Sequence, residues 1–127
     1  MAQLPLNSFR TMTAILTTNT SATIYTAPVG VTSIVLMAQI SNITTNTTAV
    51  SFIHHRNIPI QQNAQGNNAQ PGNVDSYIVE NFGLPGNDAV NVLSGKLIIE
   101  ALDSVRAYAA TPNATQLVLS ILESANS

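Results

Sequence analysis

The segment that decides the fold is residues 31–42, which has the sequence VTSIVLMAQISN. Every second residue on one face is apolar: Ile34, Leu36, Ala38 and Ile40. Side chains alternate between the two sides of a β-strand, so this period of two predicts a strand. Val35 and Met37 fall on the opposite face, and we therefore expect the middle of this strand to be covered on both sides.

The same period of two continues along the chain in both directions. Further strands are predicted for residues 11–17, 22–26, 49–55, 74–82, 89–93, 96–102, 105–110 and 116–123. Between them lie turn sequences such as Ala27-Pro28-Val29-Gly30 and Thr111-Pro112-Asn113, in which proline, glycine and asparagine favour chain reversal. The pattern predicts an all-β protein, a two-sheet antiparallel β-sandwich or jelly roll of about eight strands.

Two connections have the form of tight hairpins. Residues 44–48, with the sequence TTNTT, join the strand at 31–42 to the strand at 49–55. Asp103-Ser104 separates the strands at 96–102 and 105–110. We expect each of these two pairs of strands to be hydrogen-bonded neighbours in one sheet.

The chain of 127 residues is long enough for one hydrophobic core. We expect an N-terminal arm at residues 1–10 and a single sandwich domain at residues 11–127. A long polar loop, QQNAQGNNAQPGN, occupies residues 61–73. The arm and this loop are the candidate partner contacts, and the candidate residues are Leu4, Phe9, Arg10, Gln61, Gln62, Asn67, Asn68 and Gln70.

The charge content is unusually low. Only 8% of the residues are Asp, Glu, Lys or Arg, against roughly 25% in an ordinary soluble domain. The polar residues are mainly Asn, Thr, Ser and Gln. Because interface cores are depleted in charge, this composition favours a protein whose exterior is packed against other subunits. A monomer with a neutral surface is the alternative.

Several classes of partner are not expected. The four basic residues are scattered and the net charge is −2, so no stripe suited to nucleic acid can form. No apolar run approaches the roughly 20 residues that span a bilayer, and the first ten residues lack the pattern of a secretory signal. The sequence contains no cysteine, so disulfides and thiolate metal sites are excluded.

No catalytic or metal-binding motif is present in the sequence. His54 and His55 are neighbours on a predicted strand and so point to opposite faces, where they cannot share a metal ion. We expect no catalytic residue, no cofactor and no metal ligand. An enzyme is the alternative, and its activity would depend on His54, Glu80 or Glu100.

Two segments resemble small β-sandwich structural proteins of tailed bacteriophages, and together they cover about half of the chain. The first is IYTAPVGVTSIVLMAQISN at residues 24–42, and the second is LSGKLIIEALDSVRAYAATPNATQLVLSILES at residues 93–124. The motifs that match are Tyr25-Thr26-Ala27-Pro28, Ser41-Asn42, Gly95-Lys96-Leu97, Glu100, Asp103, the small-residue strand 107–110 and Leu122-Glu123. Leu102 departs from the pattern, because such proteins usually have glycine there.

The resemblance implies a non-enzymatic virion protein that occurs in many copies or as a homo-oligomer. Its expected partners are the major capsid protein or other virion proteins, and its expected location is the virion. A capsid decoration (cement) protein is the first interpretation. A neck, collar or tail component is the second, and a receptor- or glycan-binding tip module is the third.

Overall fold

The computed structural model describes residues 7–57 and 74–125, and in this part of the chain the fold is all-β. The strands are β1 (Asn7–Ile15), β2 (Ala22–Thr26), β3 (Val31–Asn42), β4 (Thr48–Arg56), β5 (Val74–Leu84), β6 (Ala89–Asn91), β7 (Leu97–Ile99), β8 (Ser104–Ala109) and β9 (Thr115–Ala125). Every strand pairing recorded among them is antiparallel.

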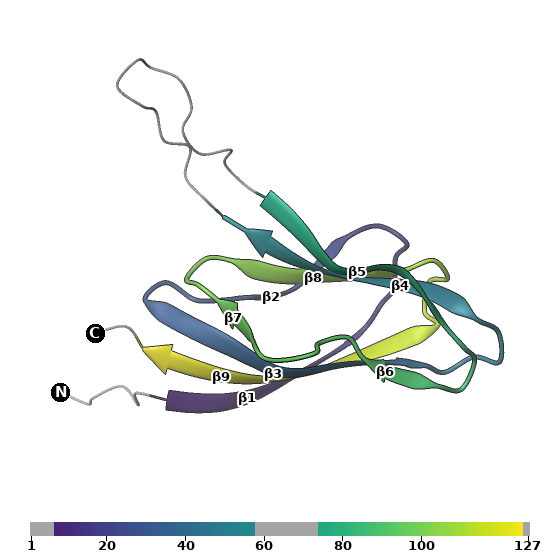
Figure 1. Ribbon diagram of the computed structural model, residues 1–127, viewed down its shortest axis with the longest axis horizontal. Helices are drawn as coiled ribbons and strands as arrows, with labels where there is room; N and C mark the ends of the chain where they lie inside the picture. Colours follow the sequence, from purple (N-terminus) through teal and green to yellow (C-terminus); the bar gives the residue numbers. More distant parts are fainter. Residues whose placement is uncertain (1–6, 58–73, 126–127) are drawn as a thin grey trace, which may run out of the picture.

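The strands form two sheets that pack face to face (Figure 1). Sheet A has the order β1-β9-β3-β6, and β7 also pairs with β3. Sheet B has the order β2-β8-β4-β5. The predicted two-sheet antiparallel sandwich is therefore confirmed.

The core lies between the sheets and is built from the inward residues of both. Sheet A contributes Val35, Ala38, Ile40, Ile99, Leu117, Leu119 and Ile121, and sheet B contributes Val50, Phe52, Val105, Ala107 and Ala109; all are at most 1% exposed. The inward side chains of sheet A are larger than those of β8. The alanines of β8 leave room for the branched side chains of sheet A. Burial of this apolar surface is the main force that holds the sheets together.

A β-bulge in β3 changes which residues face the core. The register between β3 and β9 shifts between Val35 and Met37. Ser33 and Val35 are fully buried before the shift, and Ala38 and Ile40 are fully buried after it. The prediction that Ile34 and Leu36 share a face with Ile40 is therefore wrong, because a bulge inserts one extra residue and reverses the alternation.

Both expected hairpins are also wrong, since each connection crosses from sheet A to sheet B. β3 lies in sheet A and β4 in sheet B, and β7 lies in sheet A and β8 in sheet B. The crossing after β3 is fixed by the buried Asn42, whose Nδ2 donates to Leu84 O at 3.1 Å and to Asn46 O at 2.8 Å. Its Oδ1 accepts from Thr44 N at 3.0 Å, so one side chain holds the whole arch.

The connection after β5 packs directly against this arch. A Cβ added to Gly86 would lie 2.4 Å from the backbone carbonyl carbon and oxygen of Thr45. Asn87 N donates to Thr44 O at 2.9 Å, and Asn87 has a positive φ of 58°. The two crossings therefore touch through their backbones, and only glycine fits at residue 86.

Strand β1 begins at Asn7, four residues before the expected start at residue 11. Residues 7–10 of the expected arm are therefore part of sheet A, where their backbone pairs with residues 121–124 of β9. Few of these residues are apolar, so the sequence pattern alone did not predict the pairing that orders them. Residues 1–6 lie outside the described residues.

Candidate docking surface

The outward strand positions of sheet A carry apolar side chains and no charged ones. The outward positions follow from the register, in which Phe9 pairs with Leu122, Thr13 with Val118 and Ile34 with both Leu122 and Ile98. The apolar members are Phe9, Ile15, Ile34, Leu36, Met37, Ile98, Val118 and Leu122. The other outward residues of these strands are Asn, Gln, Ser, Thr or Ala. We call this surface the sheet A face.

Three side chains on the sheet A face are strongly exposed. Phe9 is 77% exposed, Ile98 is 59% exposed and Ile15 is 53% exposed. They come from β1 and β7, on opposite sides of the sheet, with the half-buried residues of β9 and β3 between them. The exposed apolar surface therefore spans the sheet instead of forming a single spot.

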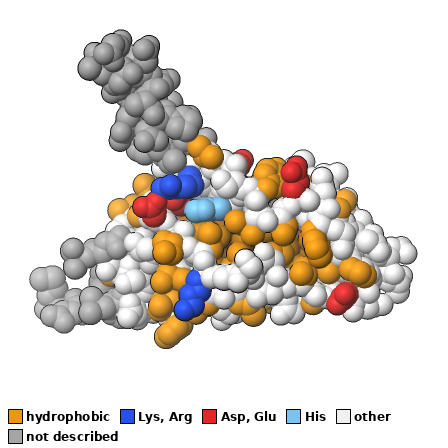
Figure 2. Space-filling view, viewed as in Figure 1, with side chains coloured by type: hydrophobic (Ala, Val, Ile, Leu, Met, Phe, Trp, Pro, Cys, Tyr) orange, Lys and Arg blue, Asp and Glu red, His pale blue; other side chains and the backbone are white. Residues whose placement is uncertain are grey.

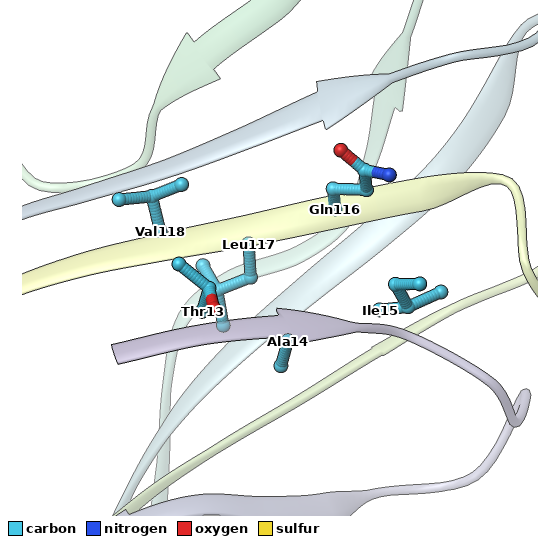
Figure 3. A pocket seen from close by; sticks show the side chains of 6 residues that line it. All are labelled: Thr13, Ala14, Ile15, Gln116, Leu117 and Val118. Carbon is cyan, nitrogen blue, oxygen red and sulfur yellow. The ribbon is translucent and has the colours of Figure 1, made fainter. Parts of the chain in front are cut away.

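A shallow hollow lies between β1 and β9 at one end of these strands. Figure 3 shows that its lining side chains come from both strands: Thr13, Ala14, Ile15, Gln116, Leu117 and Val118. None of them is charged, and Gln116 is the one that offers an amide. The hollow suits a small apolar side chain from a partner with one hydrogen-bonding group beside it.

The outer face of sheet B has a different composition. Ile53 pairs with Tyr77 and Arg106 on this face and is completely buried, although it is not part of the core between the sheets. Tyr77 and Tyr108 are hydrogen-bonded, which raises the pKa of Tyr77. His55 Nδ1 pairs with Asp75. The side chains of sheet B thus cover Ile53, and Asp75 pairs with His55, whereas the buried Arg106 Nε has no hydrogen-bond partner among the described residues.

Charged side chains gather at one end of the sandwich, where β4 ends. Asp103 is 2% exposed, and its carboxylate accepts from Arg56 Nε at 3.2 Å and from Asn57 N at 2.8 Å. Arg56 also pairs with Glu100. Figure 2 shows acidic, basic and histidine side chains gathered at that end of the molecule. Because the single Arg56 guanidinium bridges the carboxylates of Glu100 and Asp103, the cluster holds the connection between β7 and β8 against the end of β4.

His54 points between the sheets next to this cluster. Its Nε2 lies 3.9 Å from Asp103 Oδ2 and has no hydrogen-bond partner among the described residues. Burial lowers the pKa of His54, and the neighbouring Asp103 carboxylate opposes that effect. His54 lies on the same face of β4 as Val50 and Phe52, which are both buried in the core.

A second polar network joins the two sheets beside Arg10. Tyr25 of sheet B donates its hydroxyl to Glu123 Oε2 of sheet A at 2.5 Å, and the same hydroxyl lies 2.7 Å from Ser33 Oγ. Burial raises the pKa of Tyr25 to about 12, and the hydrogen bond to Glu123 adds to the effect. Arg10 Nη1 pairs with Glu123 at 3.3 Å.

The structure separates the two candidate contact residues that lie in β1. Phe9 is on the sheet A face, whereas Arg10 lies on the inner side of the sheet and forms an ion pair with Glu123. The remaining candidates, Leu4, Gln61, Gln62, Asn67, Asn68 and Gln70, lie outside the described residues. Sequence analysis did not identify Ile98, Ile15, Leu122 or Val118 as contact residues. The available signal was the apolar residues on both faces of residues 31–42 and 116–123.

Within residues 7–57 and 74–125, the structure contains no group of three or more His, Asp or Glu side chains arranged to hold a metal ion. Nor does this described part contain a helix of the length and hydropathy needed to cross a membrane.

Comparison with known proteins gave a distant structural likeness. No protein-family model and no curated protein matches the sequence. Among solved structures, a chain of the T13 IBDV viral particle superposes with a TM-score of 0.47 and 9% sequence identity. The superposition covers 94% of this chain and 31% of that chain, so the present chain spans about a third of its length.

Proposed function

We propose that this chain is a non-enzymatic structural protein of a tailed-bacteriophage virion, and within the virion a capsid decoration (cement) protein. The observation that carries the proposal is the sheet A face, an uncharged and partly apolar surface that spans the sheet. The two segments that resemble phage structural proteins contain β3, β7 and β9, which supply most of that face.

The proposed mechanism is attachment of the sheet A face to the assembled shell. Removing exposed apolar surface from water favours association, and the absence of charge avoids the cost of desolvating ions at the contact. A site that exists only where shell subunits meet is present only in the assembled state. A protein that binds such a site stabilises the shell by mass action, and the repeated lattice multiplies the effect.

The sandwich is suited to this role because it presents the face as a preformed surface. The inward residues of β3 and β9 are packed in the core. The hydrogen bond from Tyr25 to Glu123 also connects sheet B to β9. A rigid surface loses little conformational entropy when it binds, so more of the contact energy contributes to affinity.

The non-enzymatic part of the proposal is supported by how the ionisable groups are used. Glu100 and Asp103 are both paired with Arg56, and Glu123 is paired with Arg10. Among the residues named above for an enzyme, His54 is half-buried beside Asp103, and Glu80 lies in β5 of sheet B. This pairing favours stability over proton transfer to a substrate.

The test is binding of purified protein to particles of the encoding phage that lack it. Ile98→Lys places a charge in the sheet A face and is expected to weaken binding at least about tenfold, because the lysine must be desolvated at the contact. Val29→Lys is the matched control, since Val29 is 81% exposed in the turn before β3 and lies off the face. Cosedimentation measures both.

Cryo-electron microscopy of the native particle provides the second measurement. A decoration protein is expected at every equivalent site of the shell lattice. A single ring of density at the neck or in the tail would overturn the decoration assignment, and absence of the chain from the particle would overturn the virion assignment. Equal binding of Ile98→Lys and Val29→Lys would overturn the role of the sheet A face.

A further inference from the structure

The free edge of β1 differs from the other sheet edges in the described part of the chain. An exposed edge strand offers unpaired N–H and C=O groups to another strand, and proteins normally protect such edges with short strands, bulges or charges. β6 and β7 have three residues each, and β2 has five residues with a register shift. β5 carries two register shifts, Asp75, Glu80 and a positive φ at Asn81.

β1 has none of this protection along its nine residues. Its register with β9 runs from Asn7 to Ile15 without a shift, and it contains neither proline nor glycine. Its one charged residue, Arg10, is paired with Glu123 of the neighbouring strand at 3.3 Å. The edge is therefore long, regular and electrically neutral.

The hydrogen-bonding pattern shows which backbone groups are available. Leu16 N donates to Thr115 O at 3.1 Å, in line with the β1–β9 register. Because bonded and non-bonded positions alternate in an antiparallel pair, the even-numbered residues of β1 bond to β9 and the odd-numbered ones point to the free edge. The groups on offer are those of Asn7, Phe9, Thr11, Thr13 and Ile15.

We infer that β1 pairs antiparallel with β1 of a second copy of this chain, about a two-fold axis through Thr11. Thr11 is the middle residue of β1, so this register places all nine residues opposite a partner. It brings the free N–H and C=O groups of the odd-numbered residues of both copies together. Thr11 lies opposite its own copy, and Phe9 lies opposite Thr13 of the second copy.

The side chains support this register over the two nearest ones. Aromatic residues next to β-branched ones, and threonine next to threonine, are favourable cross-strand pairs. A two-fold axis through Arg10 would instead place two like charges directly opposite each other, which is unfavourable. An axis through Met12 would leave Asn7 and Ser8 without partners. With the axis at Thr11, each Arg10 lies opposite Met12 and keeps Glu123 as its own counter-ion.

The pairing has a consequence for the outer surface. A two-fold axis perpendicular to the sheet keeps the outward residues of both copies on the same side. The sheet A faces of the two copies then join into one continuous uncharged surface with Thr11 at its centre. The inference does not depend on the proposed virion role, because it follows from the edge strand alone.

The decisive experiment uses cysteine cross-linking, which is clean because the chain has no cysteine of its own. In a hydrogen-bonded antiparallel pair the Cα atoms are about 5.5 Å apart, within the range of a disulfide. Thr11→Cys is therefore expected to form a disulfide-linked dimer on mild oxidation. Ser120→Cys is the matched control, because Ser120 lies next to Thr11 on β9 and is expected to remain monomeric.

Two results would overturn the inference. One is equal cross-linking of Thr11→Cys and Ser120→Cys, which would indicate random collision. The other is cross-linking of Met12→Cys in preference to Thr11→Cys, which would place the axis elsewhere.

Sedimentation velocity of the unlinked protein provides an independent measurement. Thr11→Pro removes an N–H that points to the free edge while leaving the bonds between β1 and β9 intact, and proline is tolerated on edge strands for this reason. We expect it to raise the dimer dissociation constant at least about tenfold, because the two central hydrogen bonds are lost. Ser120→Lys, which alters the sheet A face one strand inward, is expected to leave the dimer intact.

The same two variants distinguish failure of this inference from failure of the proposed function. Thr11→Pro breaks the edge and keeps the face, whereas Ser120→Lys breaks the face and keeps the edge. A wild-type protein that stays monomeric at all concentrations would overturn the edge pairing, whatever its binding to phage particles.

Discussion

The two outer faces of the sandwich handle apolar residues in opposite ways. On sheet B, Ile53 is completely buried beneath its neighbours, and charged and tyrosine side chains form the surface. On sheet A, Ile98 and Phe9 remain more than half exposed, and no charged residue occupies an outward strand position. Both faces belong to sheets of similar size packed on the same core, so the core does not require the difference.

The comparison indicates that side chains of sheet B cover the isoleucine on its own outer face, whereas apolar side chains on the outer face of sheet A stay exposed to water. A monomer gains nothing in stability from side chains left in water, and a large uncharged apolar patch promotes association. The distribution of the ten charged residues agrees with this division. Two of them, Arg10 and Glu123, lie in strands of sheet A and pair with each other on its inner side, and the other eight lie in strands of sheet B or in the connections. Sheet A is the side on which a partner can replace water.

The largest expected effect comes from truncating one isoleucine on each face. Ile53→Ala is expected to lower the free energy of unfolding by about 2–5 kcal/mol, because it leaves a cavity at a fully buried site. Ile98→Ala is expected to lower it by less than about 0.5 kcal/mol, because that side chain is mostly in water. Urea denaturation of the two variants measures the difference, and equal losses would contradict the distinction between the faces.

A smaller effect is expected at Leu102, in the connection from sheet A to sheet B. Leu102 has a φ of 71°, a left-handed conformation that costs a residue with a side chain roughly 1–2 kcal/mol. Leu102→Gly removes this strain, and part of the gain is offset by the greater freedom of glycine in the unfolded chain.

We therefore expect Leu102→Gly to raise the stability by up to about 1 kcal/mol, measured as a higher urea midpoint. Because Leu102 lies on neither outer face, binding to particles should stay unchanged. A loss of stability would show that the half-exposed leucine side chain contributes more than its backbone strain costs.

The smallest expected effect is a pH dependence that originates between the sheets. Burial lowers the pKa of His54 below its ordinary value of 6.5, so the unfolded chain binds this proton more readily than the folded one. The stability contributed by neutral His54 is complete above about pH 6.5 and is lost as the pH falls through the lowered pKa.

Urea midpoints at about pH 7.5 and pH 5.5 measure this dependence. The wild type is expected to lose more stability between the two than His54→Gln, which cannot bind the proton. His55→Gln is the matched control on the outer side of sheet B. Identical slopes for the wild type and His54→Gln would contradict the effect.

Local structure could be predicted well from the sequence because it depends on neighbouring residues. The expected strands at 22–26 and 31–42 have the bounds of β2 and β3. The turn at Pro28–Gly30 is closed by Val31 N donating to Pro28 O at 3.1 Å, with Gly30 at a φ of 75°. Leu102, which stands where the similar phage proteins usually have glycine, has a left-handed conformation with a φ of 71°.

Strand pairing could not be predicted in the same way. A threonine-rich connection such as residues 44–48 suits a hairpin and an arch between sheets equally well. Whether it crosses depends on Asn42 meeting Leu84, which lies 42 residues later in the chain. The bulge after Val35 has the same character, since it is defined by the register with β9.

The candidate surface was predictable only in part for the same reason. Phe9 was among the candidate contact residues because it lies in the expected N-terminal arm. Ile98 lies in a three-residue strand and joins the sheet A face only through its pairing with Ile34. The face is assembled from strands far apart in the sequence, and no local pattern records their order.

The close approach of Gly86 to Thr45 bears on how this protein could be engineered to carry a peptide tag. At Gly86 even a methyl group would collide with the carbonyl of Thr45. A peptide tag inserted there would therefore separate the two connections that pack against each other. The turn at Ser94-Gly95 is open, because among the described residues no atom beyond the two chain neighbours lies within 4 Å of a Cβ built on Gly95. This turn is therefore the better site at which to insert a peptide tag.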